Sequence, residues 1–183
     1  TNVFLDVFPW IFLLYMPFKD RLRFSVITTG VLNYIALTIY LLIFKKITTA
    51  EFYNLDVMFS YRVVQIFVVL TLVIFLVDDY IEKSLFVYGL LLPISVVILV
   101  WASHINNYIT IRQSATYLDT AVLRIIISAI CFPFMYILWK KYIVPVVKTD
   151  NRRQWRQAWI IPIIFSIVSL AYCENNFEIT YMR

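Results

Sequence analysis

The stretch KKYIVPVVKTDNRRQWRQAWIIPIIF, residues 140–165, decides how this chain is organised. It sets six cations against the single acid Asp150, and long apolar runs lie on both sides of it. A dense Lys/Arg loop between two hydrophobic segments is the strongest indicator of orientation in a membrane protein. Trp155 and Trp159 lie where the next apolar run begins, which is the position of an interfacial aromatic belt. We therefore expect these two rings at the lipid headgroups, together with Lys140, Lys141, Lys148, Arg152, Arg153 and Arg156.

The composition agrees with a chain that lies in lipid. Of its 183 residues, 62% are hydrophobic and 15% are charged. A soluble domain has about 45–50% apolar and about 25% charged residues. The apolar runs are continuous, whereas the strands of a membrane β-barrel alternate between apolar and polar side chains. The composition therefore predicts helices that cross a bilayer.

The runs predict an all-α polytopic membrane protein, with about six transmembrane helices in a bundle. We treat residues 1–183 as a single transmembrane domain, with polar connections at 47–62 and 104–119. Only two glycines are present, so we expect the helices to contact one another through bulky side chains. The predicted helices cover residues 3–18, 24–44, 62–77, 85–103, 119–139 and 158–173.

The distribution of cations predicts the orientation. With the amino terminus outside, the inner loops hold ten of the sixteen Lys and Arg residues, and the outer loops and tail hold five. This places the basic loop 140–157 in the cytoplasm of a multi-pass cell-membrane protein. Lys45 and Lys46 argue for the opposite orientation. The net charge is +5, and its cations lie beside apolar runs, so we expect anionic lipid headgroups as partners rather than nucleic acid.

Polar residues near the predicted outer face are the candidates for ligand contact. Arg124 lies just inside the fifth segment, where it either recognises an anion or extends its side chain to the interface. Asp78 and Asp79 end the third segment on the inner side, and we expect both to be solvated. The sequence predicts no metal site and no cofactor. The other candidate ligand contacts are His104, Asn106, Asn107 and Arg112.

Two functions of other classes stay open at this point. A small transporter or channel subunit would need a continuous polar pathway, for which Asn33, Gln65 and Arg124 are the mid-segment candidates. A membrane peptidase would use Cys131 or Cys173, with a base within reach of the thiol.

Three pieces of the sequence together resemble a known family. They are FPWIFLLYMPFKDRLRFS at 8–25, CFPFMYILWKKYIVPVV at 131–147 and WRQAWIIPIIF at 155–165. Their order is similar to the N-terminal membrane sensor of bacterial GHKL-type histidine kinases, a group that includes the peptide-sensing accessory gene regulator kinases. The resemblance covers most of the chain, and its motifs carry no catalytic residue.

The resemblance implies a sensor region of a two-component signalling system. Such a region would detect an extracellular signal, for example a peptide, and relay it to a cytoplasmic kinase that this chain does not contain. It would have no phosphotransfer activity of its own, so His104 is not assigned as a phosphoacceptor. The resemblance also implies a homodimer. Pro133 and Pro162 are the candidate flex points beside the basic loop.

Overall fold

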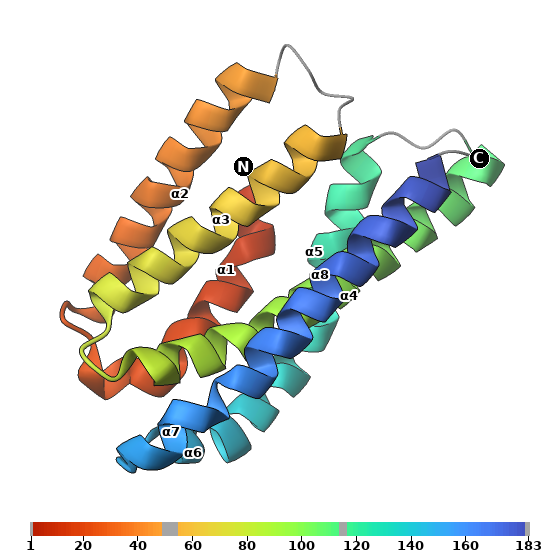
Figure 1. Ribbon diagram of the computed structural model, residues 1–183. Helices are drawn as coiled ribbons and strands as arrows, with labels where there is room; N and C mark the ends of the chain where they lie inside the picture. Colours follow the sequence, from red (N-terminus) through yellow and green to blue (C-terminus); the bar gives the residue numbers. More distant parts are fainter. Residues whose placement is uncertain (1, 49–54, 114–116, 182–183) are drawn as a thin grey trace. The chain divides into compact units, whose positions relative to one another are not determined.

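The computed structural model describes residues 2–48, 55–113 and 117–181. Helices account for most of these residues, and no strand occurs among them apart from a single isolated bridge between Leu22 and Val77. The predicted all-α class is therefore confirmed. The elements in chain order (Figure 1) are α1 (Asn2–Tyr15), the 3-10 helix η1 (Met16–Arg21), α2 (Val26–Thr48), α3 (Leu55–Leu76), α4 (Ile81–Gln113), α5 (Tyr117–Leu138), the π-helix η2 (Trp139–Ile143), α6 (Val144–Val147), α7 (Arg152–Ala158) and α8 (Ile160–Tyr181).

Within the described residues, four helical stretches are long and apolar enough to cross a membrane, where six were predicted. One reason lies in α1, which has 14 residues and ends at Tyr15 rather than at residue 18. The residue before a proline is disfavoured in the α conformation, and here that residue is Met16, directly after the end of α1. The apolar part of α3, Val64–Leu76, is also shorter than a full span. The four long stretches are Val26–Ile43, Ile81–Ala102, Ile125–Val147 and Arg152–Tyr172.

The helices extend beyond the predicted apolar segments, so three predicted connections are partly or largely helical. Helix α3 begins at Leu55, inside the connection expected at 47–62. Helix α4 has 33 residues and continues to Gln113, through much of the connection expected at 104–119. At about 1.5 Å per residue, such a helix exceeds the roughly 30 Å hydrocarbon core of a bilayer. Apolar composition marks the lipid-embedded part of a helix and not its ends.

The basic loop predicted at 140–157 is also largely helical. α5 continues through the π turn of η2 into α6, because Leu138 and Val144 both keep α-helical backbone angles. The amide of Val144 donates to the carbonyl of Trp139, the long hydrogen bond that defines a π-helix. Pro145 follows and has no amide hydrogen to donate. The chain leaves the helix only around Thr149–Asn151, before α7 begins.

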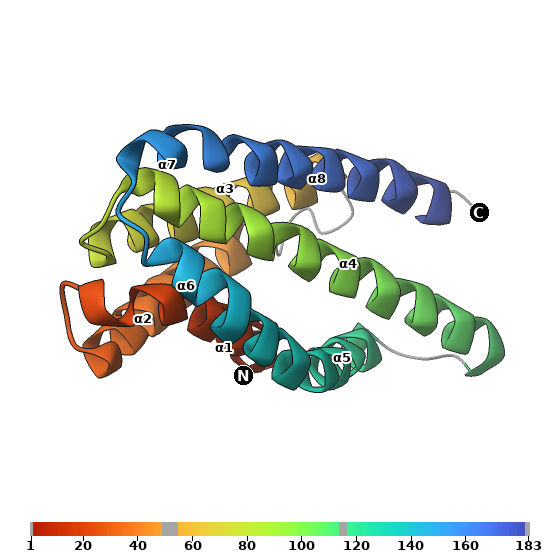
Figure 2. The same cartoon turned by 90° about the horizontal axis from the view of Figure 1, so that it is seen from below.

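The chain forms two compact units, which we describe separately. In the unit 18–84, α2 and α3 run side by side (Figure 1), and the rings of Phe24 and Phe75 lie 6.3 Å apart. The other unit comprises residues 1–17 and 85–183. There α1 packs on α5 through Phe12, whose ring contacts Phe132 and Tyr136. In both ribbon views α8 runs alongside α4 from the end that carries α7 (Figures 1 and 2).

The described part of the chain has an apolar core and also exposes many large apolar side chains. Large apolar side chains are exposed on several helices, including Ile27 at 80%, Ile130 at 72% and Ile161 at 76%. Several polar residues are buried together with the apolar core, although polar side chains are mostly exposed in soluble proteins. In a membrane, apolar side chains face lipid and polar ones face other helices. The structure is thus compatible with membrane insertion. The buried polar residues are Thr29, Asn33, Lys83, Ser84, Ser128 and Ser166.

Candidate functional site: two polar joints and a basic hairpin

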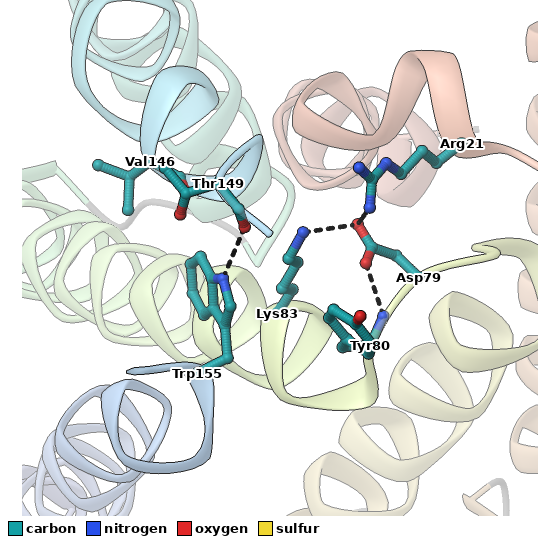
Figure 3. Close-up of polar contacts among 7 residues, drawn as sticks. All are labelled: Arg21, Asp79, Tyr80, Lys83, Val146, Thr149 and Trp155. Atoms are coloured by element: carbon teal, nitrogen blue, oxygen red, sulfur yellow. Dashed lines mark hydrogen bonds and ion pairs between the residues drawn. The ribbon is translucent and has the colours of Figure 1, made fainter. Parts of the chain in front are cut away.

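The first polar joint is a buried ion-pair cluster in the unit 18–84 (Figure 3). One carboxylate oxygen of Asp79, Oδ2, lies 3.0 Å from Arg21 Nη1 and 3.1 Å from Lys83 Nζ. The other oxygen accepts a 2.7 Å hydrogen bond from the amide of Tyr80. The side chains of Asp79 and Lys83 are 3% and 0% exposed. Because a buried charge is costly unless it is paired, the two residues need each other.

The local backbone brings these charges together. Lys83 lies one turn after Asp79 at the start of α4, and Arg21 ends η1. The segment after Arg21 and the segment before Asp79 form an isolated β-bridge between Leu22 and Val77. Two backbone hydrogen bonds flank the bridge, from Arg23 N to the Leu76 carbonyl at 2.9 Å and from Asp78 N to the Arg21 carbonyl at 2.8 Å. The basic residues after α1 are therefore held in register with the acidic residues after α3.

The prediction that Asp78 and Asp79 are both solvated was right for Asp78 and wrong for Asp79. The Asp78 side chain is 78% exposed, and it lies 3.6 Å from Arg23 in an exposed pair. Asp79 is buried between two cations. One signal in the sequence could have found this joint. The cations at 19–23 and the acids at 78–79 were predicted on the same side of the membrane, where opposite charges attract.

The second joint lies in the other unit, where α4 and α8 cross. The hydroxyl Oγ of Ser166 lies 2.7 Å from the carbonyl oxygen of Gly89 in α4 and 2.8 Å from that of Pro162 in its own helix. In a regular helix the Gly89 carbonyl would accept the amide hydrogen of residue 93, but Pro93 has none. Ser166 therefore satisfies a carbonyl that a proline has left without its usual partner, as side chains of neighbouring helices do in membranes.

Gly89 is the residue that permits this close crossing. A Cβ atom at position 89 would lie 3.0 Å from the carbonyl carbon and Cβ of Pro162, and 3.1 Å from the amide nitrogen of Ile163. Real Cβ contacts are rarely this short, and two of these atoms belong to the backbone. The expectation that the helices contact one another through bulky side chains therefore does not hold at this crossing. Although glycines are few, one of the two is placed where two backbones approach each other.

The third feature is the basic hairpin, which we define as residues 140–157. Its Trp155 is 2% exposed, and its ring packs edge-on against that of Phe86, with 5.3 Å between the ring centroids. The indole N–H donates to the Thr149 carbonyl at 2.9 Å (Figure 3), while the Thr149 hydroxyl donates to the Val146 carbonyl at 2.7 Å. Burial and this hydrogen bond hold the indole of Trp155 inside the fold, and its predicted position at the headgroups stays a prediction. Trp159 is half-buried.

All six cations of the hairpin have exposed side chains, as a headgroup-facing surface requires. Lys140 and Lys141 lie on the π turn η2, Lys148 caps α6, and the three arginines lie on α7. On α7 the arginines surround the one buried residue, Trp155. Helix α7 therefore turns its tryptophan inward and its three arginines outward.

The residues predicted to contact a ligand lie on two helices. His104 is exposed on α4. Asn106, Asn107 and Arg112 follow on α4, and Arg124 lies on α5, but their side chains are outside the part of the chain that the structure describes. Their assignment as a ligand site stays a prediction.

The residues of the alternative functions are placed as follows. Asn33 is buried on α2 and donates through Nδ2 to the Thr29 carbonyl at 2.8 Å, and Gln65 is half-buried on α3. Cys131 is half-buried on α5, whereas the Cys173 side chain lies outside the described residues. Pro133, one of the two predicted flex points, is exposed, and α5 runs through it without a break.

No protein-family model, curated protein or solved structure matches this chain.

Proposed function

We propose that this chain is the membrane-embedded sensor region of a bacterial GHKL-type histidine kinase. It detects an extracellular signal, such as a peptide, and passes a helix movement to a cytoplasmic kinase. The proposal starts from the resemblance of residues 8–25, 131–147 and 155–165. Residues from all three pieces contribute to the joints and the hairpin, and Lys140 and Lys141 of the second piece lie in the hairpin. Arg21 pairs with Asp79, Trp155 holds the hairpin, and Pro162 lies against Gly89.

The observation that carries the proposal is the position of Ser166 between two acceptors. A sensor needs two packings of its helices that a ligand binds unequally. The Ser166 hydroxyl has one hydrogen and two carbonyl oxygens within reach, one on α4 and one on its own helix. When the hydroxyl donates to the Gly89 carbonyl, it links α8 to α4. When it donates to the Pro162 carbonyl, the hydrogen bond stays within α8. The crossing therefore offers two hydrogen-bonding states of one hydroxyl, and we propose that the signal shifts the balance between them.

The proposal includes an orientation in the cell membrane. The amino terminus is outside, and the basic hairpin is in the cytoplasm. The signal contacts the outer ends of α4 and α5, where the candidate residues are His104, Asn106, Asn107, Arg112 and Arg124. The working form is a homodimer, as in the family that the sequence resembles.

The experiment measures ATP-dependent autophosphorylation of the full-length protein in inverted membrane vesicles, loaded with cell-free culture supernatant as the probe. We expect phosphate incorporation that changes with the supernatant dose. An Arg124→Ala variant should shift that dose response, and an unchanged response removes Arg124 from the site. A full-length protein that incorporates no phosphate in active vesicles would overturn the kinase assignment.

The orientation is tested by single cysteines at Lys148 and Arg153, introduced after Cys131 and Cys173 have been replaced by serine. Both positions are exposed on the hairpin, so a thiol there can react. A reagent that cannot cross membranes should leave them unlabelled in intact cells and label them in inverted vesicles. The opposite pattern would reverse the orientation and remove the signal-facing assignment of the outer residues.

The buried amide of Asn33 supports a second candidate, a small transporter or channel subunit. A polar side chain inside a membrane helix often marks a substrate pathway. Solute or ion flux into liposomes that contain the purified chain separates the two functions. Flux that Asn33→Leu abolishes would favour transport, and vesicles that stay impermeable would remove this candidate.

A further inference from the structure

The basic hairpin holds the whole net charge of the chain. Residues 140–157 contain six cations and one acid, a net charge of +5, and the complete chain also has a net charge of +5. The rest of the protein is therefore electrically balanced. All six cationic side chains of the hairpin are exposed, so this charge lies at one surface.

The fold, and not the sequence alone, turns these cations outward. Val147 and Trp155 of the hairpin are 1% and 2% exposed, and Trp139, which precedes it, is 3% exposed, so these three side chains lie inside the fold. The turn between α6 and α7 is closed by the indole of Trp155 on the Thr149 carbonyl. It is also closed by backbone hydrogen bonds from Gln154 and Trp155 to the Asn151 carbonyl. The cations are thus presented on a hairpin of defined geometry.

Exposed apolar side chains flank the cations. They are Tyr142, Val146, Ile160 and Ile161, with exposures from 40% to 76%. A cationic surface bordered by apolar side chains matches the boundary between headgroups and acyl chains of a membrane leaflet. A purely polar polyanion such as nucleic acid would leave those apolar side chains in water. Charge and apolar flanks together therefore favour a lipid over other polyanions.

We propose that the basic hairpin is a docking surface for anionic phospholipid headgroups, with Arg152, Arg153 and Arg156 of α7 as its central contacts. Arginine suits phosphate because its planar donors can engage two oxygens together. The inference does not depend on the kinase assignment, since it concerns the lipid environment of this region in any function. The apolar flanks enter the leaflet, and the arginines bind the phosphodiesters at its surface.

The test measures binding of short-chain phosphatidylglycerol to the purified full chain in a neutral detergent, by native mass spectrometry. Short-chain phosphatidylcholine is the neutral comparison. A cation near an anionic membrane surface contributes about 1 kcal/mol, or about a fivefold change in affinity, so R152Q/R153Q/R156Q should weaken phosphatidylglycerol binding by at least about fivefold. Binding of phosphatidylcholine should not change.

The matched control is K45Q/K46Q/R62Q, which removes the same number of charges elsewhere in the chain. We expect it to keep the phosphatidylglycerol affinity of the wild type. R152K/R153K/R156K retains the charges without the paired planar donors, so it should lose less affinity than R152Q/R153Q/R156Q. Its binding also verifies that α7 tolerates substitution. Equal losses of phosphatidylglycerol affinity in the two glutamine variants would mean that lipid binding depends on the net charge of the chain and not on the hairpin. Unchanged binding in R152Q/R153Q/R156Q would also overturn the proposal.

Discussion

The hydroxyl of Ser166 in α8 lies 2.7 Å from the carbonyl oxygen of Gly89 in α4, and the two residues are 77 positions apart in the sequence. This contact supplies the donor that Pro93 cannot provide within α4. A buried carbonyl without a partner is costly where water is excluded. Proline, glycine and serine therefore form one arrangement at this crossing, and each has a separate, measurable effect.

Replacing Ser166 by Ala should destabilise the protein by about 0.6–1.7 kcal/mol, which are the average and the maximum measured for hydrogen bonds between membrane helices. The substitution removes the donor and leaves the Gly89 carbonyl unsatisfied. Unfolding in mixed micelles with increasing dodecyl sulfate measures the loss. Ser169→Ala is the matched control, because Ser169 lies on the same helix and donates only within it, to the Phe165 carbonyl. Equal losses in the two variants would contradict the special role of Ser166.

A double-mutant cycle tests why Ser166 has this role. In a Pro93→Ala chain, residue 93 has an amide hydrogen that can reach the Gly89 carbonyl within α4. Ser166→Ala should then cost less than it does beside Pro93. The coupling between the two positions is obtained from the four unfolding free energies. If the two effects simply add, Ser166 does not compensate for Pro93.

Gly89→Ala and Gly30→Ala should change stability in opposite directions. The new Cβ at 89 would press on backbone and side-chain atoms of Pro162 and Ile163, which we expect to cost about 1–3 kcal/mol. Nothing lies within 4 Å of the corresponding atom at Gly30. Alanine there should stabilise α2 by about 0.5–1 kcal/mol, because glycine is unfavourable inside a helix. The same unfolding assay compares them, and a neutral Gly89→Ala would show that α8 can move away without cost.

Asp79→Asn should be the most damaging of these substitutions. It leaves the buried Lys83 without its carboxylate, and removing one partner of a buried ion pair costs about 3–5 kcal/mol. Asn can still accept the amide hydrogen of Tyr80, so the change isolates the charge. Asp78→Asn is the control, since the exposed Asp78–Arg23 pair should contribute about 0–1 kcal/mol.

A compensating substitution separates charge from packing at Asp79. Lys83→Met in the Asp79→Asn chain removes the uncompensated cation and keeps a long side chain in the interior. Replacing both members of a buried pair by neutral groups is often tolerated. Most of the lost stability should therefore return. If it does not return, the cost of Asp79→Asn comes from geometry and not from the buried charge.

The properties of this fold that depend on local sequence could be predicted, and the contacts between distant residues could not. Helical class and apolar spans follow from composition and run length, so they were predictable, as at Val26–Ile43. The ion pair of Arg21 with Asp79 and the Ser166–Gly89 hydrogen bond join residues far apart in sequence. No local period encodes such contacts. Trp155 shows a different limit of prediction from sequence. Its residue type and its place beside an apolar run are typical of a membrane–water interface, but packing against Phe86 buries its ring in the fold.

Trp155→Phe tests whether the indole hydrogen bond keeps the basic hairpin ordered. Phenylalanine retains an aromatic ring beside Phe86 and loses the donor to the Thr149 carbonyl. The loss of one hydrogen bond should cost about 0.5–1.5 kcal/mol. The more specific effect is faster amide hydrogen exchange at Thr149–Trp155, measured by mass spectrometry in detergent. Trp101→Phe is the control, since Trp101 is 62% exposed on α4 and should leave that exchange unchanged. If the hairpin exchanges at the wild-type rate in Trp155→Phe, the ring packing alone holds it, and the hydrogen bond does not.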